Sequence, residues 1–159
     1  MIRKYRESDR EILKQITAQT FEPVSIDASI AKMFGDPAGT TWHQRKLRQI
    51  DADCDANPDG IFVYEEGGVV IGFVTTRLDQ FAKTGWIPNM AVAEGQQGKG
   101  IGHQLVVKAL EYFRENGMEL ARIETLIQNE VGAHLYTKFG FKEVARQIYY
   151  CMRLDKGKG

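Results

Sequence analysis

A glycine-rich segment near the middle of the chain has the residue types of an anion-binding loop. Gly98, Gly100 and Gly102 follow one another at every second position, between a β-branched stretch and an amphipathic stretch. Because glycine has no Cβ atom, the backbone N–H groups of such a loop can approach an anion closely. A helix that begins there adds unpaired N–H donors and the positive end of its dipole. The segment predicts a phosphate-binding loop, with a flexible tight turn as the alternative.

Two familiar phosphate-binding motifs do not fit this segment. A Walker loop ends in Gly-Lys followed by Ser or Thr, whereas this chain has Lys99-Gly100-Ile101 and lacks the hydroxyl that binds magnesium. The dinucleotide-binding fingerprint needs its third glycine three residues after the second, but Gly102 follows Gly100 by only two. Both nucleotide-binding interpretations are therefore disfavoured.

The elements on either side of the glycines must position them. Residues 85–93 predict a strand, in which Pro88 indicates an edge position or a local irregularity. After the glycines, Ile101, Leu105 and Ala109 repeat every four positions, which predicts a helix with one apolar face that ends before Asn116-Gly117. The loop should therefore connect a strand end to a helix start.

The rest of the chain predicts an α/β or α+β fold. Runs with helical apolar spacing and short β-branched or aromatic runs are separated by Gly, Pro and Asn. Two of the β-branched runs flank Glu65-Glu66-Gly67-Gly68 and predict a hairpin. The predicted strands are residues 1–6, 61–64, 69–76, 85–93, 121–127 and 141–154, and the predicted helices are residues 8–22, 27–34, 41–56, 98–115 and 129–139.

Composition predicts one soluble domain over residues 1–155, with a disordered tail at 156–159. Of the 159 residues, 43% are hydrophobic and 26% charged, which is typical of globular domains. The longest apolar run spans only residues 69–74, whereas a membrane-spanning helix needs about 20 residues. The first residues also lack the apolar stretch of a signal peptide, so we expect a cytoplasmic protein that does not enter a membrane.

The charge balance predicts no nucleic-acid partner, because 21 basic residues are matched by 21 acidic ones. The basic cluster at residues 45–48 is followed by Asp51, Asp53 and Asp55, which is typical of the solvated face of a polar helix. No metal site is expected. The three histidines and two cysteines are scattered without ligand spacing, at His43, His103, His134, Cys54 and Cys151.

Two motifs together resemble the GNAT N-acetyltransferase superfamily. The segment Gln97-Gly98-Lys99-Gly100-Ile101-Gly102 matches the family's acyl-CoA-binding pattern Gln/Arg-x-x-Gly-x-Gly/Ala. A second block near the C-terminus, with Asn129, Ala133 and the run 135–141, lies at the distance that the family shows. The order of predicted elements from residue 1 to about 154 is also similar. The resemblance implies a mixed, mostly antiparallel central sheet flanked by helices.

The same resemblance implies that acetyl-CoA is the co-substrate. Its pyrophosphate would lie on the N–H groups of the glycine segment, and its pantetheine would pair like an added strand with the preceding strand. An N–H group of that strand would polarise the thioester carbonyl. The implied CoA-binding residues are Met90, Ala91, Val92, Gln97, Gly98, Lys99, Gly100, Ile101, Gly102, His103 and Asn129.

Tyr136 and Glu124 are the candidate catalytic residues that the resemblance implies. A phenol with a pKa of about 10 can protonate a departing thiolate, which makes Tyr136 the expected general acid; simple packing within a helix is the alternative. Glu124 resembles the general base of the branch that acetylates protein N-termini, and strand alternation predicts that it is partly buried. Alternatively, Asn89 orders a water and the acceptor amine arrives neutral.

The acceptor stays open between a small amine and a peptide N-terminus or lysine. Arg146, Tyr149 and Tyr150 resemble a motif of protein N-terminal acetyltransferases, but the longer hairpin that follows in those enzymes is absent here. A non-catalytic CoA-binding regulator on the same fold is the alternative function, although such a regulator would have lost Tyr136 or the glycines. Either a monomer or a homodimer is compatible with the sequence.

Overall fold

The computed structural model describes residues 1–154, and its strands form two sheets. The first sheet is antiparallel throughout, with neighbouring strands in the order β1-β2-β3-β6. In the second sheet, of order β4-β5-β7, only the β5–β7 pair is parallel. The predicted mixed, mostly antiparallel architecture is confirmed. The strands are β1 (Ile2–Lys4), β2 (Phe62–Glu66), β3 (Val69–Val74), β4 (Arg77–Asp79), β5 (Thr84–Ile87), β6 (Met90–Val92) and β7 (Leu120–Ile123).

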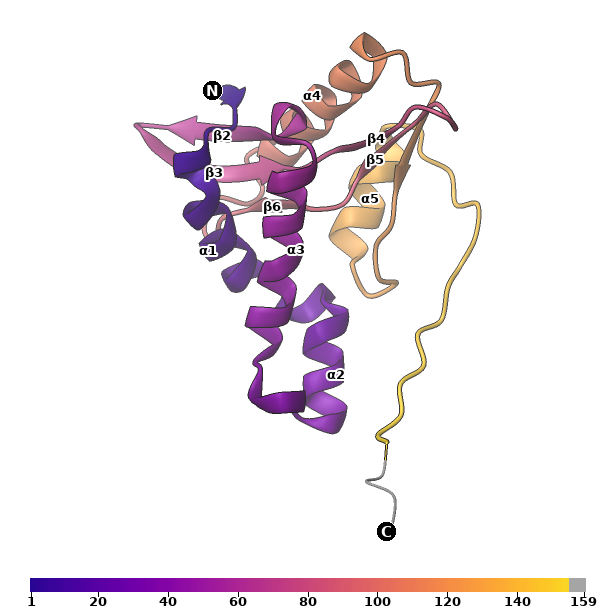
Figure 1. Ribbon diagram of the computed structural model, residues 1–159. Coiled ribbons are helices and arrows are strands. Elements are labelled where there is room, and N and C mark those ends of the chain that lie inside the picture. Colours follow the sequence, from indigo (N-terminus) through magenta and orange to yellow (C-terminus); the bar gives the residue numbers. More distant parts are fainter. Residues whose placement is uncertain (155–159) are drawn as a thin grey trace.

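Helices cover both faces of the first sheet (Figure 1). Leu13 and Ile16 of α1 and Ile50 of α3 form one core with β2 and β3, while Ile101 and Leu105 of α4 form the second core on the other face. The helices are α1 (Arg10–Thr20), α2 (Ile26–Phe34), α3 (Trp42–Ala56), α4 (Ile101–Glu115) and α5 (Glu130–Lys138), with single 3₁₀ turns at Glu7–Asp9, Glu22–Val24, Pro37–Gly39 and Pro58–Gly60.

A glycine in β3 sets how closely α4 approaches the sheet. A Cβ atom on Gly72 would lie 3.1 Å from Ile101 Cγ2 and 3.3 Å from Leu105 Cδ1. Both distances are tighter than ordinary van der Waals contact, so only the bare backbone lets the first turns of α4 pack against this strand. The packing fixes the start of α4, and with it the glycine loop, beside β6.

The predicted strand over residues 85–93 is divided into two strands of different sheets. β5 pairs with β4 and β7, whereas β6 pairs with β3. The break falls at Pro88-Asn89, opposite a similar break at Thr75-Thr76. Proline cannot donate a ladder hydrogen bond, which explains why the pairing is interrupted there.

The predicted strand over residues 141–154 is wrong. This segment is extended but belongs to neither sheet, and Figure 1 shows it in yellow, running away from α5. Ile148, Tyr150 and Leu154 of this segment are at least 72% exposed. A β-branched or aromatic run forms a strand only when a neighbouring strand accepts its hydrogen bonds, and none does so here. The tail predicted at residues 156–159 lies outside the described residues.

Among residues 1–154, none of the helices is both long enough and apolar enough to cross a bilayer.

Candidate active site

One edge of β6 has no neighbouring strand within the described part of the chain. β6 pairs with β3 on its other side, where Ala93 N donates to Ile71 O and Thr75 N donates to Asn89 O, both at 2.8 Å. Backbone groups alternate in direction along an antiparallel strand, so the N–H groups of Met90 and Val92 face the open edge. The edge therefore offers backbone donors to an extended ligand.

The glycine loop follows this edge directly. Gly98 and Gly100 both have left-handed backbone conformations, with φ of 81° and 77°, and a Cβ atom on either would point into open space. Gly100 is the N-cap of α4 and provides no side-chain cap. Ile101, Gly102 and His103 form the first turn, whose N–H groups have no partner within the helix. The predicted strand-to-helix loop is confirmed.

The charged and amide side chains at Gln96, Gln97 and Lys99 of the loop make local contacts. Gln97 Nε2 donates to Val92 O at 3.3 Å, and Lys99 Nζ donates to Gln96 Oε1 at 2.7 Å. The first contact holds the loop against the end of β6, because it uses the carbonyl that faces the open edge.

Packing of α5 brings the second sequence block to the glycine loop. The rings of His103 and Phe139 stack with centroids 4.5 Å apart. A Cβ atom on Gly102 would lie 3.6 Å from Leu135 Cδ2 and 3.9 Å from Met90 Cε, so α4, α5 and β6 meet at this glycine. Tyr136 follows Leu135 in α5, and burial raises the pKa of its hydroxyl to about 12. Tyr136 is therefore protonated at neutral pH.

Asn129, which the family resemblance implies as a CoA-binding residue, is the N-cap of α5. Its Oδ1 accepts from Gly132 N at 3.1 Å, and its Nδ2 donates to Thr125 Oγ1 at 2.7 Å. Both groups of the side-chain amide thus have partners inside the protein. The cap orients the helix that carries Tyr136.

The environment of Glu124 in the structure differs from the predicted one. β7 ends at Ile123, so Glu124 lies just beyond the strand, and its side chain is 55% exposed. Its carboxylate forms an ion pair with Arg122 at 2.7 Å and accepts from Trp86 Nε1 at 2.5 Å. The prediction of a partly buried carboxylate in mid-strand is wrong, because β7 is a short edge strand that is not covered on its outer side. Glu124 is thus exposed, and its carboxylate is paired with the guanidinium of Arg122.

Two charged residues that the sequence assigns to the solvated face of α3 are buried in the structure. Lys46 is 8% exposed and Asp53 is 3% exposed. Together with Ile50 they follow an i, i+4, i+7 pattern, which is the signal that places them on one inner face of the helix. Neither was predicted as a site residue, although both reach the break between β5 and β6.

Burial lowers the pKa of Lys46 to about 8, and the nearby carboxylates of Asp53 and Asp27 only partly offset this effect. Asp53 is held in turn by Arg77, whose Nη2 lies 2.7 Å from Asp53 Oδ1. The charged form of Lys46 is thus destabilised relative to its ordinary pKa of 10.5.

This pKa shift makes the stability of the protein dependent on pH. Between pH 8 and 10.5 the unfolded chain binds a proton at Lys46 that the folded chain has lost, so the free energy of unfolding should rise with pH. In this window the free energy of unfolding of the wild-type protein should rise, relative to that of Lys46→Met, by up to about 1.4 kcal/mol per pH unit. Urea unfolding at pH 7 to 10 measures the difference. Lys32→Met, at an exposed position of α2, is the control, and parallel wild-type and Lys46→Met curves would contradict the shift.

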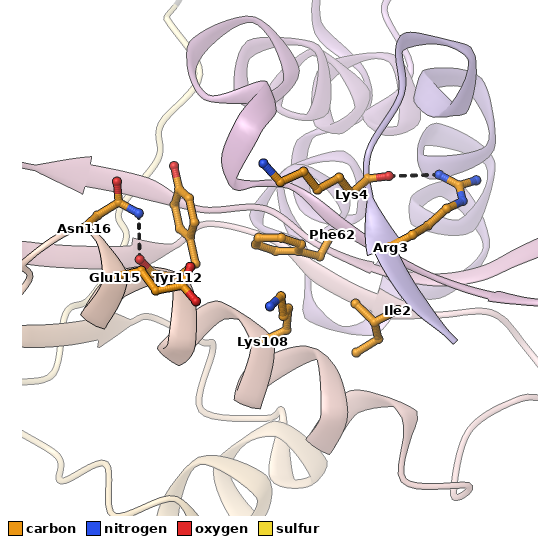
Figure 2. Close-up of a pocket in the computed structure, with 8 residues that line it drawn as sticks. All are labelled: Ile2, Arg3, Lys4, Phe62, Lys108, Tyr112, Glu115 and Asn116. Carbon is orange, nitrogen blue, oxygen red and sulfur yellow. Dashed lines mark hydrogen bonds between the residues drawn. The ribbon is translucent and has the colours of Figure 1, made fainter.

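A cavity of about 420 Å³ lies apart from this site, between β1 and the second half of α4. Figure 2 shows Lys4, Phe62, Lys108 and Tyr112 around it. Its lining includes none of the residues at the β6 edge, in the glycine loop or in α5. The candidate site is therefore an open strand edge and not this hollow.

The open edge of β6, the uncapped start of α4 and the tyrosine-bearing helix α5 meet around Gly102. The family model described as acetyltransferase (GNAT) family matches residues 27–141, a span that contains these elements. The chain belongs to the acetyltransferase (GNAT) family.

The individual curated relatives are only distantly similar to the chain. The chain is 26% identical over 140 residues to a mycothiol acetyltransferase of Thermomonospora curvata, a match that covers 85% of this chain and 47% of that protein. The chain thus spans about half the length of the curated relatives it matches.

Solved structures share the fold. The PaiA N-acetyltransferase of Thermoplasma acidophilum, in complex with coenzyme A, superposes with a TM-score of 0.71 at 20% identity, covering 89% of each chain. Ard1 from Thermoplasma volcanium superposes with a TM-score of 0.68 at 23% identity, covering 91% of this chain and 84% of that one.

Proposed function

We propose that the protein transfers the acetyl group of acetyl-CoA to a primary amine by direct attack of the amine. The observation that carries this proposal is the open edge of β6, where the N–H groups of Met90 and Val92 point away from β3. The residues present fit CoA. A strand edge suits the amide groups of pantetheine, and the uncapped turn at Ile101–His103 suits a pyrophosphate.

In this function acetyl-CoA supplies an acetyl group activated as a thioester. The N–H of Met90 donates to the carbonyl oxygen and stabilises the negative charge that develops there as the C–N bond forms. Tyr136 gives its proton to the sulfur as the C–S bond breaks, and regains one from solvent. The raised pKa of Tyr136 keeps that proton in place until the thiolate forms.

We assign the general base to Glu124, which takes a proton from the acceptor ammonium before attack, or from the amine as the C–N bond forms. Its exposed carboxylate, beside Trp86 of β5, is open to an incoming acceptor. The alternative route is an acceptor amine that arrives already neutral. Asn89, which this route expects to order a water, is buried, and its side-chain amide is bound to Lys46 and Asp53.

Replacing Glu124 with glutamine distinguishes these two routes. If Glu124 is the base, Glu124→Gln should lower kcat/KM by about 10²-fold and remove the acidic limb of its pH profile. Arg122→Gln, which removes the ion-pair partner but keeps the carboxylate, is the matched control and should retain that limb. A Glu124→Gln profile with an intact acidic limb would exclude Glu124 as the base.

For the acceptor we propose a small amine or a peptide amine. Arg146, Tyr149 and Tyr150, which resemble part of a peptide-binding motif, lie in the exposed C-terminal segment, so their position gives a peptide groove no support. Small amines are therefore the first class to test.

The deciding experiment measures thiol release from acetyl-CoA with polyamines, amino acids, aminoglycosides and N-terminal peptides. Sustained thiol release that depends on one class of amine is the expected result. Calorimetric titration with CoA, ATP and NAD runs beside it. Tight binding of ATP or NAD without binding of CoA would overturn the proposal.

A further inference from the structure

A chain of buried polar groups joins α3 to the break between the two sheets. Lys46 and Asp53 lie about two turns apart on α3 and reach Asn89 from either side. Asn89 is 4% exposed and immediately precedes Met90, the first residue of β6. These buried polar groups thus end one residue before Met90, whose N–H faces the open edge.

The two charges fix the orientation of the Asn89 side chain. Lys46 Nζ donates to Asn89 Oδ1 at 2.7 Å, and Asn89 Nδ2 donates to Asp53 Oδ2 at 2.7 Å. An amide oxygen can only accept and an amide nitrogen can only donate in these contacts. A flipped amide would lose both bonds, so the cation and the carboxylate together select one orientation.

The backbone of Asn89 is held as firmly as its side chain. Its N–H donates to Thr75 Oγ1 at 3.1 Å, and its carbonyl accepts from Thr75 N at 2.8 Å. Thr75 Oγ1 donates in turn to Asp53 Oδ2 at 2.7 Å. Asp53 therefore anchors both strands at the break, where regular sheet pairing is lost.

Stability alone does not account for this arrangement. Burying an ammonium and a carboxylate costs desolvation energy that apolar residues of similar size would not incur. Lys46 Nζ also donates to Gln49 Oε1 at 3.0 Å and lies 4.3 Å from the Phe21 ring centroid, and both contacts favour the ammonium in this low-dielectric setting. A fully satisfied polar network at a sheet break restricts the backbone to one geometry.

We propose that Lys46 and Asp53 are positioning residues which act through Asn89 to hold the Met90 N–H in line with the acyl carbonyl at the open edge of β6. The inference rests on the proposed acetyl transfer and deepens it. The two residues touch neither substrate. A small rotation at Asn89 would turn the Met90 N–H away from the carbonyl oxygen without removing the binding edge.

The first experiment is a double-mutant cycle with Lys46→Met, Asn89→Ala and the combined variant. Each single change should lower kcat about tenfold and leave the KM for acetyl-CoA within about twofold, because only the alignment of one donor changes. The combined variant should be no slower than the slower single variant. Arg48→Met, on the exposed side of α3, is the matched control and should keep the wild-type kcat. Independent, multiplying effects would overturn the proposal.

The second experiment measures the polarisation of the thioester carbonyl directly. Isotope-edited infrared spectroscopy of acetyl-CoA labelled with ¹³C at the thioester carbonyl should show a band at lower wavenumber on the wild-type protein than in solution. In Lys46→Met and Asn89→Ala the band should move back toward the solution value while calorimetry still shows binding. If these variants bind acetyl-CoA but the band stays at its wild-type position, the positioning role alone is overturned.

Two further outcomes keep the test decisive. If the wild-type protein neither binds nor turns over acetyl-CoA, the proposed function fails, and the positioning role fails with it. If circular dichroism shows that Lys46→Met is unfolded, Lys46→Gln takes its place, because glutamine is polar and uncharged. The same band shift is expected, since a neutral donor of shorter reach cannot hold Asn89 as the ammonium does.

Discussion

Replacing Tyr136 with phenylalanine is expected to lower kcat about 100-fold and to leave the affinity for CoA nearly unchanged. The phenol has its pKa raised to about 12 by burial, so it carries its proton at neutral pH and can deliver it to a departing thiolate. Phenylalanine keeps the ring that packs against Phe141 in an edge-on contact, with centroids 6.1 Å apart. Only the proton donor is lost, which is why binding should survive.

Steady-state rates with saturating acetyl-CoA measure this loss, and calorimetric titration with CoA measures binding. Tyr64→Phe in β2 is the matched control, because it removes a phenol from a strand remote from α5. Unchanged turnover in Tyr136→Phe would remove Tyr136 from the mechanism and leave it a packing role. A loss of CoA binding equal to the loss of rate would point to a binding role instead.

Replacing Gly100 with alanine is expected to weaken CoA binding more than tenfold. Gly100 is the N-cap of α4 with φ of 77°, a conformation that costs an L-residue about 1–2 kcal/mol. The strain favours a local rearrangement that turns the first N–H groups of the helix away from a bound pyrophosphate. Because the glycine lies in an exposed loop, the core that supports α4 should be unaffected.

Gly95→Ala provides a control of matched strain. Gly95 also has φ of 77° and open space where a Cβ atom would lie, but it precedes the Gln97–Gly102 motif. Titration of both variants with CoA separates the effect of backbone strain from the effect of lost phosphate contact. Equal losses would mean that loop strain, and not phosphate contact at the start of α4, sets the affinity. A normal affinity in Gly100→Ala would contradict the pyrophosphate assignment.

Local patterns were sufficient to predict most helices. The third predicted helix, residues 41–56, corresponds to α3, and its start at Thr41 is fixed by a capping box with Gln44. The predicted helix over residues 129–139 corresponds to α5. Asn129 caps its start, and Gly140, in the left-handed conformation, follows its end; both are signals within a few residues of the helix they bound. Such signals need no knowledge of distant contacts.

Strand pairing was harder to predict from the sequence than the helices were. A single predicted strand over residues 85–93 became β5 and β6, because the partners on either side of Pro88 belong to different sheets. The apolar C-terminal run stayed unpaired for the same kind of reason, since β-propensity acts only where a partner strand is present.

The glycine loop, the helix that follows it and the family resemblance were determined by the sequence alone, because a few adjacent residue types specify a turn, a cap and an apolar face. The open edge of β6, the exposure of Glu124 and the burial of Lys46 and Asp53 around Asn89 were decided only by the tertiary structure. Each of these depends on which distant segment packs beside the residue, and thus on the solvent and charges that it meets.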